Sequence, residues 1–444
     1  MAAVGALMLT GCAGPLDRER GGFDGWAERD APVRYALAER YGGNGGGGGN
    51  GGGGGGVGAL PEAPALADYL RYAAEHNPGL EAAFEDWQAA VERVPQARAL
   101  ADPQLSYRYV IHAMVERQAV GLSQAIPWYG RLRARGDAAS AQAEAAAHRF
   151  DAALLELRYE VKQAWAEYAY LARALAVMRE NAAVAEELEA AARARFEAGE
   201  GVWADVVQAS LGRERIEDEI ASFEARREPT VARLNAALGR PAELELPWPG
   251  EAIEVPMIDV DEAALLARLD EANPELAALS RETASARHEL RAARLNRVPD
   301  VTVGAEYMQS PGDRDMVELM ASVNLPIWAG RTRAERAEAL AGFGAAEARR
   351  VDRRHALGAE LRLALSTYRD GVRRVELYDG TLIPMAREAL EASEAAYAQG
   401  AAAFEALARA QTALLELELA RERIVVDAFE AAARIEQLVG GDVQ

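Results

Sequence analysis

The sequence is short of cysteine, of aromatic residues and of long hydrophobic segments. Its single cysteine, Cys12, excludes an intramolecular disulfide framework. Aromatic residues make up only 7% of the chain, whereas 50% of the residues are hydrophobic, a balance typical of long helices and coiled-coil packing. No run of eighteen apolar residues occurs, so no membrane-spanning helix is predicted. A water-soluble chain, a lipid-anchored chain and a β-barrel remain open.

Positive charge is scarce as well. The chain has 49 lysine and arginine residues against 70 aspartate and glutamate residues, which gives a net charge of −21. Because nucleic acids and anionic lipid surfaces attract basic proteins, this charge argues against either as the main partner. We therefore expect no nucleic-acid binding.

The residues of an enzyme active site are also missing. The sequence offers no nucleophile–base arrangement and no glycine-rich phosphate loop. The histidines lack the spacing of metal ligands; they are His76, His112, His148, His288 and His355. We therefore predict no catalysis, no cofactor and no metal site.

The N-terminal stretch MAAVGALMLTGCAG resembles a bacterial lipoprotein signal. Leu9 stands three residues before Cys12, and the small residue Gly11 precedes it, as in a lipobox. The resemblance implies a signal over residues 1–12 and lipidation of Cys12; the alternative is a chance Gly-Cys pair in a leader. Residues 42–58 are almost all glycine and predict a flexible segment over 13–60.

Short phrases recur in the same order in the two halves of the chain. The interval is 196 residues at two Pro pairs, 200 at a Gly-Arg pair and 201 at a later glycine. The matched residues are Pro78 and Pro274, Pro103 and Pro299, Gly130 and Gly330, and Gly199 and Gly400. Such a series indicates an internal duplication, with a first repeat over 61–250 and a second over 251–444.

Each repeat contains two segments in which every second residue is apolar. They are PQLSYRYVI and AVGLSQAI in the first repeat, and PDVTVGAEYM and MVELMASVNL in the second. This period of two predicts strands, each about ten residues long, the length of a tilted strand that crosses a bilayer. A soluble hairpin with one face on a core is the alternative.

Long stretches with no proline or a single proline predict long helices after each strand pair. The first runs from Arg131 to Gly199, about 100 Å at the rise of an α-helix. The second, from Arg331 to Gly400, contains Pro384, which should kink it. A shorter helix then returns over 202–238 and over 401–438. We expect each returning helix to stack end to end on the helix before the strands, predicted over 66–100 and 273–296.

The phrases IPWYGR and LPIWAGR join the last strand of each pair to its long helix. In each phrase a proline ends the strand and a tryptophan suits a membrane–water interface. A glycine allows a tight turn, and an arginine begins the helix on its solvated side. These corner residues are Pro127, Trp128, Gly130 and Arg131, and Pro326, Trp328, Gly330 and Arg331.

Four strands cannot close into a barrel, and an open edge in lipid would leave backbone groups unsatisfied. Strands in a membrane would therefore require several copies of the chain. In this order and in duplicate, the Asn-Pro pairs, strand entries, corner phrases and tip glycines resemble the outer-membrane factor (TolC-like) family. The resemblance extends from about Leu66 to Leu438.

The resemblance implies a mainly α fold with membrane β-structure and the function of an exit duct. Three copies would form a twelve-stranded outer-membrane β-barrel in contact with lipid, continued by an α-barrel tunnel into the periplasm of a Gram-negative bacterium. The partners implied are the chain itself as a homotrimer, a periplasmic adaptor and an inner-membrane pump of the RND type. The acylated N-terminus would anchor this passive conduit.

The resemblance also implies roles for residues at the two helical tips. Adaptor docking is implied for Gly199, Gly201 and Val202, and for Gly400 and Ala401. A periplasmic aperture is implied for Asp205, six residues after Gly199. The second repeat departs from this pattern, because Ala406 stands at that position. Either the aperture there uses Glu405 paired with Arg409, or the aperture is weak.

The cargo is left open by the sequence. Methionines lie near both strand pairs, at Met114, Met308, Met316 and Met320. Packing of loops and strands by this adaptable side chain is the better explanation of them, and soft heavy-metal cations are the second. Multidrug or organic-compound export and type I secretion are alternatives within the family. A periplasmic coiled-coil scaffold lipoprotein is the alternative from another class.

Overall fold

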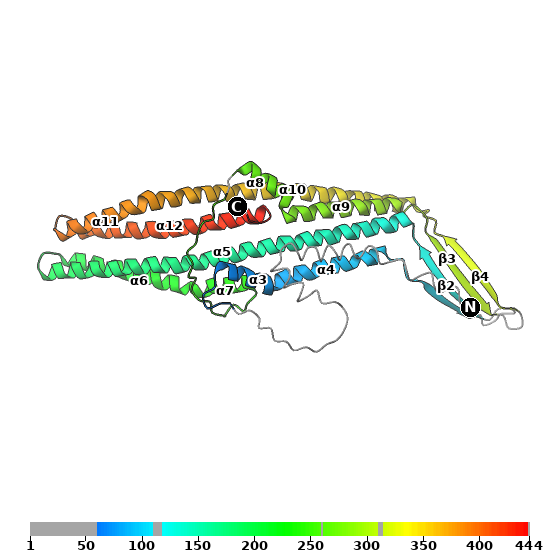
Figure 1. Ribbon diagram of the computed structural model, residues 1–444, viewed down its shortest axis with the longest axis horizontal. Helices are drawn as coiled ribbons and strands as arrows, with labels where there is room; N and C mark the ends of the chain where they lie inside the picture. Colours follow the sequence, from blue (N-terminus) through cyan, green and yellow to red (C-terminus); the bar gives the residue numbers. More distant parts are fainter. Residues whose placement is uncertain (1–59, 110–117, 259–260, 310–313, 443–444) are drawn as a thin grey trace. The chain divides into compact units, whose positions relative to one another are not determined.

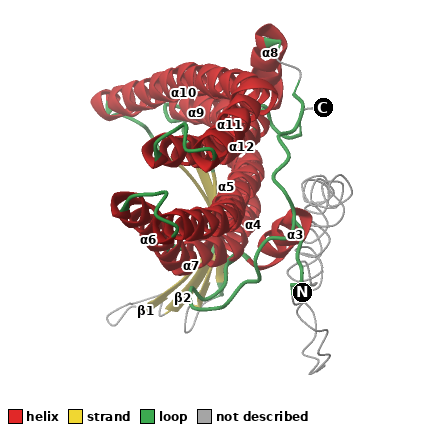
Figure 2. Ribbon diagram, turned by 90° about the vertical axis from the view of Figure 1, so that its left-hand side faces the viewer, coloured by secondary structure: helices red, strands yellow, loops and turns green. Residues whose placement is uncertain are grey.

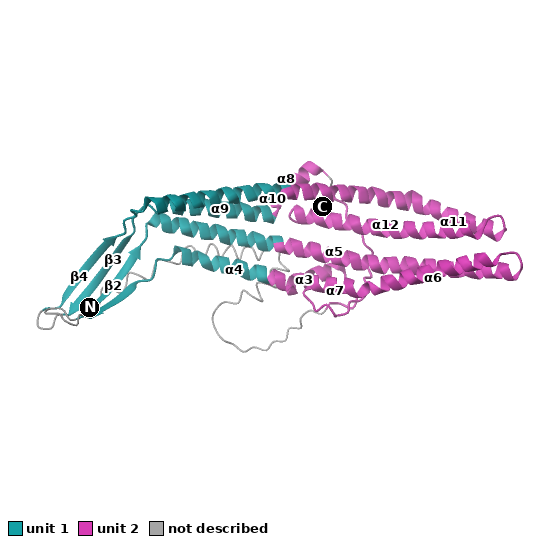
Figure 3. Ribbon diagram, turned by 180° about the vertical axis from the view of Figure 1, so that it is seen from behind, with its two compact units in different colours: residues 1–29, 82–152, 274–355 teal, residues 30–81, 153–273, 356–444 magenta. Residues whose placement is uncertain are grey.

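The computed structural model describes four stretches of the chain, residues 60–109, 118–258, 261–309 and 314–442. Cys12, the glycine-rich segment and Met114 lie outside these stretches. The chain divides into two compact units (Figure 3). The described part of unit 1 falls within 82–152 and 274–355, and that of unit 2 within 60–81, 153–273 and 356–442. Each unit therefore takes segments from both sequence repeats.

Both halves follow one plan of two helices, two strands, a long helical segment and a returning helical segment, with breaks at different places (Figure 1). The first half contains α3 (Leu66–His76), α4 (Pro78–Arg98), β1 (Gln104–Tyr109), β2 (Gln118–Ile126), α5 (Tyr129–Glu197), α6 (Trp203–Ala225) and α7 (Arg227–Leu238). The second contains α8 (Glu262–Ala272), α9 (Pro274–Leu295), β3 (Val301–Gln309), β4 (Met316–Val323), α10 (Ala329–Leu377), the π turn η1 (Tyr378–Leu382), α11 (Ile383–Ala398) and α12 (Phe404–Leu438). The predicted fold class, mainly helical with four antiparallel strands, is confirmed.

The four strands form one antiparallel sheet in the order β1-β2-β3-β4. The two predicted hairpins are joined along β2 and β3, where Leu122 lies opposite Ala305. Leu105 is the partner of Leu122, and Leu319 is the partner of Ala305. These pairs place one row of apolar residues across all four strands. The strands β1 and β4 are the two edges of the sheet.

The apolar face of the sheet is exposed. Leu105 is 76% exposed and Leu319 is 81% exposed, and no other part of unit 1 within the described ranges covers them. The opposite face is polar: Glu306 is only 4% exposed and pairs with Arg108 at 3.0 Å. A soluble hairpin would bury its apolar face on a core. This sheet instead presents that face outward, as surfaces that contact lipid or another protein do.

The long helices agree with the sequence in position and differ in detail. α5 runs uninterrupted for 69 residues, as predicted. The interruption expected near Pro384 is present, but it is a π turn rather than a simple kink. Proline has no N–H to donate to the carbonyl four residues earlier, that of Gly380, and the wider turn accommodates this loss.

No helix in the described part of the chain has the length and hydrophobicity needed to cross a membrane.

Two helices predicted as continuous are each broken in two. The returning helix of the first repeat splits at Arg226 into α6 and α7. Its cause is Pro229, which cannot donate to the carbonyl of Ala225, the last residue of α6. The helix predicted over 66–100 splits at Asn77 into α3 and α4. The helix predicted over 273–296 is confirmed as α9, whereas α8, which ends just before Asn273, was not predicted. Each asparagine is extended ahead of a proline, which ends the preceding helix.

These two asparagines form the predicted end-to-end junctions in unit 2. The Asn77 side-chain amide donates to the carbonyl of Ala237 at 2.9 Å, near the end of α7. The Asn273 amide donates to the carbonyl of Leu438 at 2.9 Å, at the end of α12. Each returning helix thus ends against the first helix of its own repeat, and a glycine with positive φ follows it: Gly239 at 73° and Gly440 at 86°.

Each unit has its own core. In unit 1, Phe84, Trp87 and Phe150 pack together with ring centroids 6.0 to 6.2 Å apart. In unit 2, α6, α11 and α12 pack beside the C-terminal part of α5 (Figure 2). The buried residues there include Ala192, Val206, Ile383, Leu390, Phe404 and Leu407. These apolar contacts hold the two helical tips together within one unit.

Candidate functional site

The two helical tips have the same backbone turn. Gly199 has a φ of 75° and Gly400 a φ of 71°, the left-handed conformation that favours glycine. After the first, the N–H of Glu200 donates to the carbonyl of Arg195 at 2.9 Å; after the second, the N–H of Ala401 donates to Ala396 at the same distance. Both are Schellman closures of a helix end. The predicted need for glycine at the tips is confirmed.

The side chains of the two tips differ. At the first tip, Phe196 and Trp203 lie with ring centroids 5.3 Å apart, and both are exposed. At the second, Tyr397 and Phe404 lie 5.5 Å apart, edge to face, and both are buried. Val202 at the first tip is also exposed. The first tip therefore carries an accessible apolar surface that the second lacks.

Arg195 links the two tips, and the sequence reasoning missed it. Its Nη1 donates to the backbone carbonyl of Tyr397, and its guanidinium lies over the Tyr397 ring at 4.7 Å from the centroid. The contact joins α5 to α11 across 202 residues of sequence. The matching position of the second repeat is Ala396, so the repeat pattern contained no signal for it.

The predicted aperture residues lie beside this link. Asp205 is half-buried, and the pKa of Tyr397 is raised, first by burial of the phenol and then by the Asp205 carboxylate. Asp205 thus faces the second tip of its own chain. Glu405 and Arg409 form the expected ion pair at 3.5 Å, with both side chains largely exposed. Their role in an aperture stays a prediction.

The corner residues lie where a strand meets a long helix in unit 1. β2 ends at Ile126, directly before Pro127, as predicted. β4 ends at Val323, three residues before Pro326. Trp128 and Trp328 are both exposed, the arrangement of aromatic residues that meet a membrane–water interface.

Residues from both repeats match one known family over most of the chain. The profile of the outer membrane efflux protein family matches residues 70–240 and 265–441. The chain belongs to this family of outer membrane efflux proteins. No curated protein matches the chain. Family membership confirms the predicted resemblance and assigns a role in efflux rather than in catalysis.

Solved channel structures share the fold of this efflux protein. VceC from Vibrio cholerae is 19% identical, with 85% of this chain and 96% of that chain covered and a TM-score of 0.73. CmeC from Campylobacter jejuni is 14% identical, with 85% and 86% covered and a TM-score of 0.73. CusC is 16% identical, with 85% and 92% covered and a TM-score of 0.74. At these identities the likeness concerns the fold alone.

Two predictions about the corners of the efflux protein are wrong. Gly130 and Gly330 lie in the first turns of α5 and α10, and neither has the positive φ of a tight turn. At both corners the helix begins directly, without a left-handed turn residue before it. Arg131 is not solvated, because its side chain is only 12% exposed and pairs with Asp300. Arg331, 77% exposed and paired with Glu335, does conform.

Asp300 organises the first corner, and the sequence reasoning missed it as well. One oxygen accepts from Arg131, and the other accepts from the backbone N–H of Trp128 at 3.1 Å. Partial burial alone would raise the pKa of Asp300, but these two hydrogen bonds hold it below its ordinary value. The carboxylate thereby ties the start of β3 to the start of α5.

We expect Asp300→Asn to destabilise the protein at neutral pH by about 1 to 2 kcal/mol, because Arg131 loses its charged partner. The depressed pKa means that this stabilisation is present above the ordinary value of 3.8 and is lost as the pH falls through the lower folded value. Thermal unfolding in detergent at a series of pH values measures it. The variant and the wild type should converge in acid, and a constant difference at all pH values would contradict the assignment.

The described residues contain no group of three or more His, Cys, Asp or Glu side chains arranged to hold a metal ion. The hairpin methionines lie on the polar face of the sheet: Met308 is opposite Met316, and Met320 is opposite Gly304. Met308 is buried, while Met316 and Met320 are exposed. They share a face and do not converge on one point.

Proposed function

We propose that this efflux protein is the outer-membrane exit duct of a tripartite system. It acts as a homotrimer with a periplasmic adaptor and an RND-type inner-membrane pump, and acylated Cys12 anchors it to the membrane. The observation that carries the proposal is the four-stranded sheet, with its exposed apolar face and its two unpaired edges.

The sheet edges explain why three copies are needed. The outer edges of β1 and β4 expose backbone N–H and C=O groups that hydrocarbon cannot satisfy. Pairing β4 of one copy with β1 of the next removes both edges and keeps all strands antiparallel. Three copies then supply twelve strands, with the apolar face toward lipid and the Glu306 face toward the pore.

The helical tips are the surface for the adaptor. The exposed apolar side chains of Val202 and Trp203 surround the turn at Gly199 and Gly201, and an adaptor hairpin can bury them. Gly400 and Ala401 offer a small, uncovered turn in the second repeat. The aperture residues Asp205, Glu405 and Arg409 lie just behind these turns.

The duct is tested by isolating the full-length protein from outer membranes. We expect an SDS-resistant trimer that migrates differently after heating, and a stable single-channel conductance in planar bilayers. The same preparation after heat denaturation is the control and should show no conductance. A monomer that carbonate extracts from the membrane would contradict the duct and support a scaffold.

For the cargo we propose heavy-metal cations. The support is the three methionines on the pore-facing side of the sheet, which share that face with Glu306 and Glu318. Deleting the gene should then sensitise cells to copper or zinc and leave dye and detergent tolerance unchanged. The opposite pattern supports organic-compound export, and loss of a secreted protein supports type I secretion; either result refutes the metal cargo.

Arg195→Ala tests the link between the tips. Without the guanidinium, α11 loses both the hydrogen bond at Tyr397 and the stacking on its ring, so the second tip separates more easily from the first. We expect a higher open probability in planar bilayers, by about fivefold for a loss of about 1 kcal/mol. Arg193→Ala, whose partner Glu189 lies on the same helix, is the matched control and should behave as the wild type. Equal conductance of both variants would contradict the link.

A further inference from the structure

The tip-bearing helices of the two repeats differ at one place. In the first repeat α5 continues without a break to Glu197. In the second repeat, the π turn η1 separates α10 from α11. The turn ends at Leu382, 18 residues before Gly400. The two tip glycines are 201 residues apart, and at the same interval Pro384 corresponds to Ala183. Ala183 lies inside the unbroken helix α5. The interruption therefore belongs to the second hairpin alone.

The π turn is packed on one side only, where Tyr378 lies against the apolar cluster of unit 2. None of its five residues is buried. A side chain added at Gly380 would meet nothing within 4 Å. Pro384 follows immediately, so the helix lacks one backbone hydrogen bond at the same level. A π turn is a local weak point in an α-helix, and such turns are frequent at functional positions.

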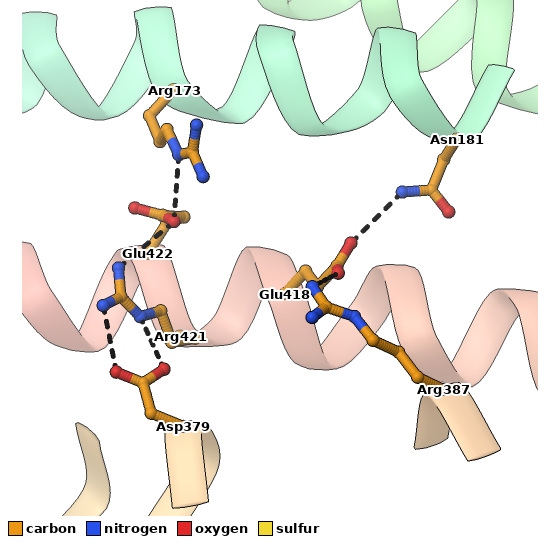
Figure 4. Close-up of polar contacts among 7 residues, drawn as sticks. All are labelled: Arg173, Asn181, Asp379, Arg387, Glu418, Arg421 and Glu422. Atoms are coloured by element: carbon orange, nitrogen blue, oxygen red, sulfur yellow. Dashed lines mark hydrogen bonds and ion pairs between the residues drawn. The ribbon is translucent and has the colours of Figure 1, made fainter. Parts of the chain in front are cut away.

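One charged contact fastens the turn to α12. The two carboxylate oxygens of Asp379 accept from Nε and Nη2 of Arg421, each at 3.0 Å (Figure 4). The pKa of Arg421 is raised, first by this hydrogen bond. Just beyond the turn, Arg387 of α11 donates to Glu418 of α12 at 2.9 Å. The bidentate geometry makes the Asp379 pair the stronger of the two contacts.

The same stretch of α12 is also fastened to α5. Glu422 accepts from Arg173 at 3.2 Å, and Glu418 accepts from Asn181 at 3.3 Å (Figure 4). Arg421 also donates to Glu422 at 3.3 Å, which connects the contact with the π turn to the contact with α5. A cavity of about 390 Å³ lies among these polar side chains. Polar contacts and a small apolar cluster, in which Val177 and Met178 of α5 meet Leu415 of α12, thus hold the second hairpin to α5 here, with open space beside the polar contacts.

We propose that the π turn Tyr378–Leu382 is a hinge for α11 and the second tip, and that the Asp379–Arg421 pair is the latch that keeps it closed. When the pair separates, α11 bends away from the axis of α10 while α5 stays straight. The inference rests on the proposed function, since a bending tip changes the opening only of a duct. Ions that screen the pair release the latch.

Hydrogen exchange of the full-length protein in detergent tests the latch directly. In Asp379→Asn we expect the amides of 376–390 to exchange about fivefold faster, because opening no longer breaks a charged bidentate pair. Arg421→Gln should do the same. The corresponding segment of α5, residues 175–189, should be unchanged. The matched control is Asp370→Asn, which removes an exposed pair with Arg373 on α10 and should leave both segments as in the wild type.

A second variant removes the hinge and keeps the latch. Gly380→Ala with Pro384→Ala restores helix-forming residues and the missing N–H, so exchange of 376–390 should slow, and adding Asp379→Asn should then have little effect. Unchanged exchange in Asp379→Asn, or equal acceleration of 175–189, would overturn the proposal. Conductance separates the two ideas: a wild type that forms no pore refutes the duct, whereas a conducting wild type with unaltered Asp379→Asn exchange refutes the hinge alone.

Discussion

Leu319→Arg is expected to keep most of the protein out of the outer membrane. Leu319 is the most exposed residue of the apolar face, 81% accessible in the middle of β4. A lipid-facing arginine near the middle of a barrel strand costs about 2 to 4 kcal/mol, and the proposed trimer would contain it three times. The heat-modifiable, SDS-resistant fraction in isolated outer membranes measures the loss. We expect that fraction to fall at least about tenfold.

Met320→Arg is the matched control on the same strand. Met320 lies one residue further along and therefore on the opposite, polar face, beside the level of Gly304. In the proposed barrel an arginine there would face the pore, so assembly should be close to that of the wild type. Equal assembly of both variants would show that the face does not contact lipid. Equal failure of both would show that β4 tolerates no arginine, whichever face it occupies.

Gly239→Ala is expected to destabilise the helical part by about 2 to 4 kcal/mol, through left-handed strain and steric overlap together. Gly239 has a φ of 73° at the end of α7. An added Cβ would lie 2.8 Å from the backbone carbonyl of His76 and 2.8 Å from Cδ of Pro78. Both neighbours are backbone or ring atoms at the junction of α3 and α4 and cannot move aside. Thermal unfolding in detergent should show a clearly lower midpoint.

Gly212→Ala provides the comparison for this substitution. Gly212 lies inside α6, where an added Cβ meets nothing within 4 Å. Alanine is the better helix former, so this variant should be slightly more stable, by about 0.5 to 1 kcal/mol. Equal unfolding midpoints for the two variants would contradict a close junction at Gly239. The second repeat offers an independent check, because Gly440 approaches the carbonyl of Ala272 in the same way.

The parts of the fold that depend on local periodicity could be predicted from the sequence. A strand in lipid or on a core alternates every two residues, and the alternation in β3 and β4 was enough to find the hairpin and both faces. Long proline-free stretches likewise predicted α5 and the position of the break at Pro384. The duplicated spacing predicted the tips at Gly199 and Gly400, because a short turn between antiparallel helices needs a left-handed residue.

The contacts between distant segments could not be predicted in this way. Asp300 pairs with Arg131 across 169 residues of sequence, and no motif around either residue indicates which residue it pairs with. Arg195 reaches Tyr397 only because unit 2 packs α5 against α11, and the repeat equivalent of Arg195 is an alanine. The break at Arg226 was missed because Pro229 lies in an otherwise helical segment, and a proline there splits a helix or is tolerated according to its surroundings, as Pro95 is within α4.

The junctions at Asn77 and Asn273 have a consequence for the history of the chain. In each repeat the last helix ends on the first helix of the same repeat, at 2.9 Å from an asparagine amide. A half-length polypeptide would therefore already bring its own beginning and end together and needs no second half for that contact. Joining two such halves would require only a connecting segment, here residues 239–261, and would halve the number of chains that must meet in the proposed assembly.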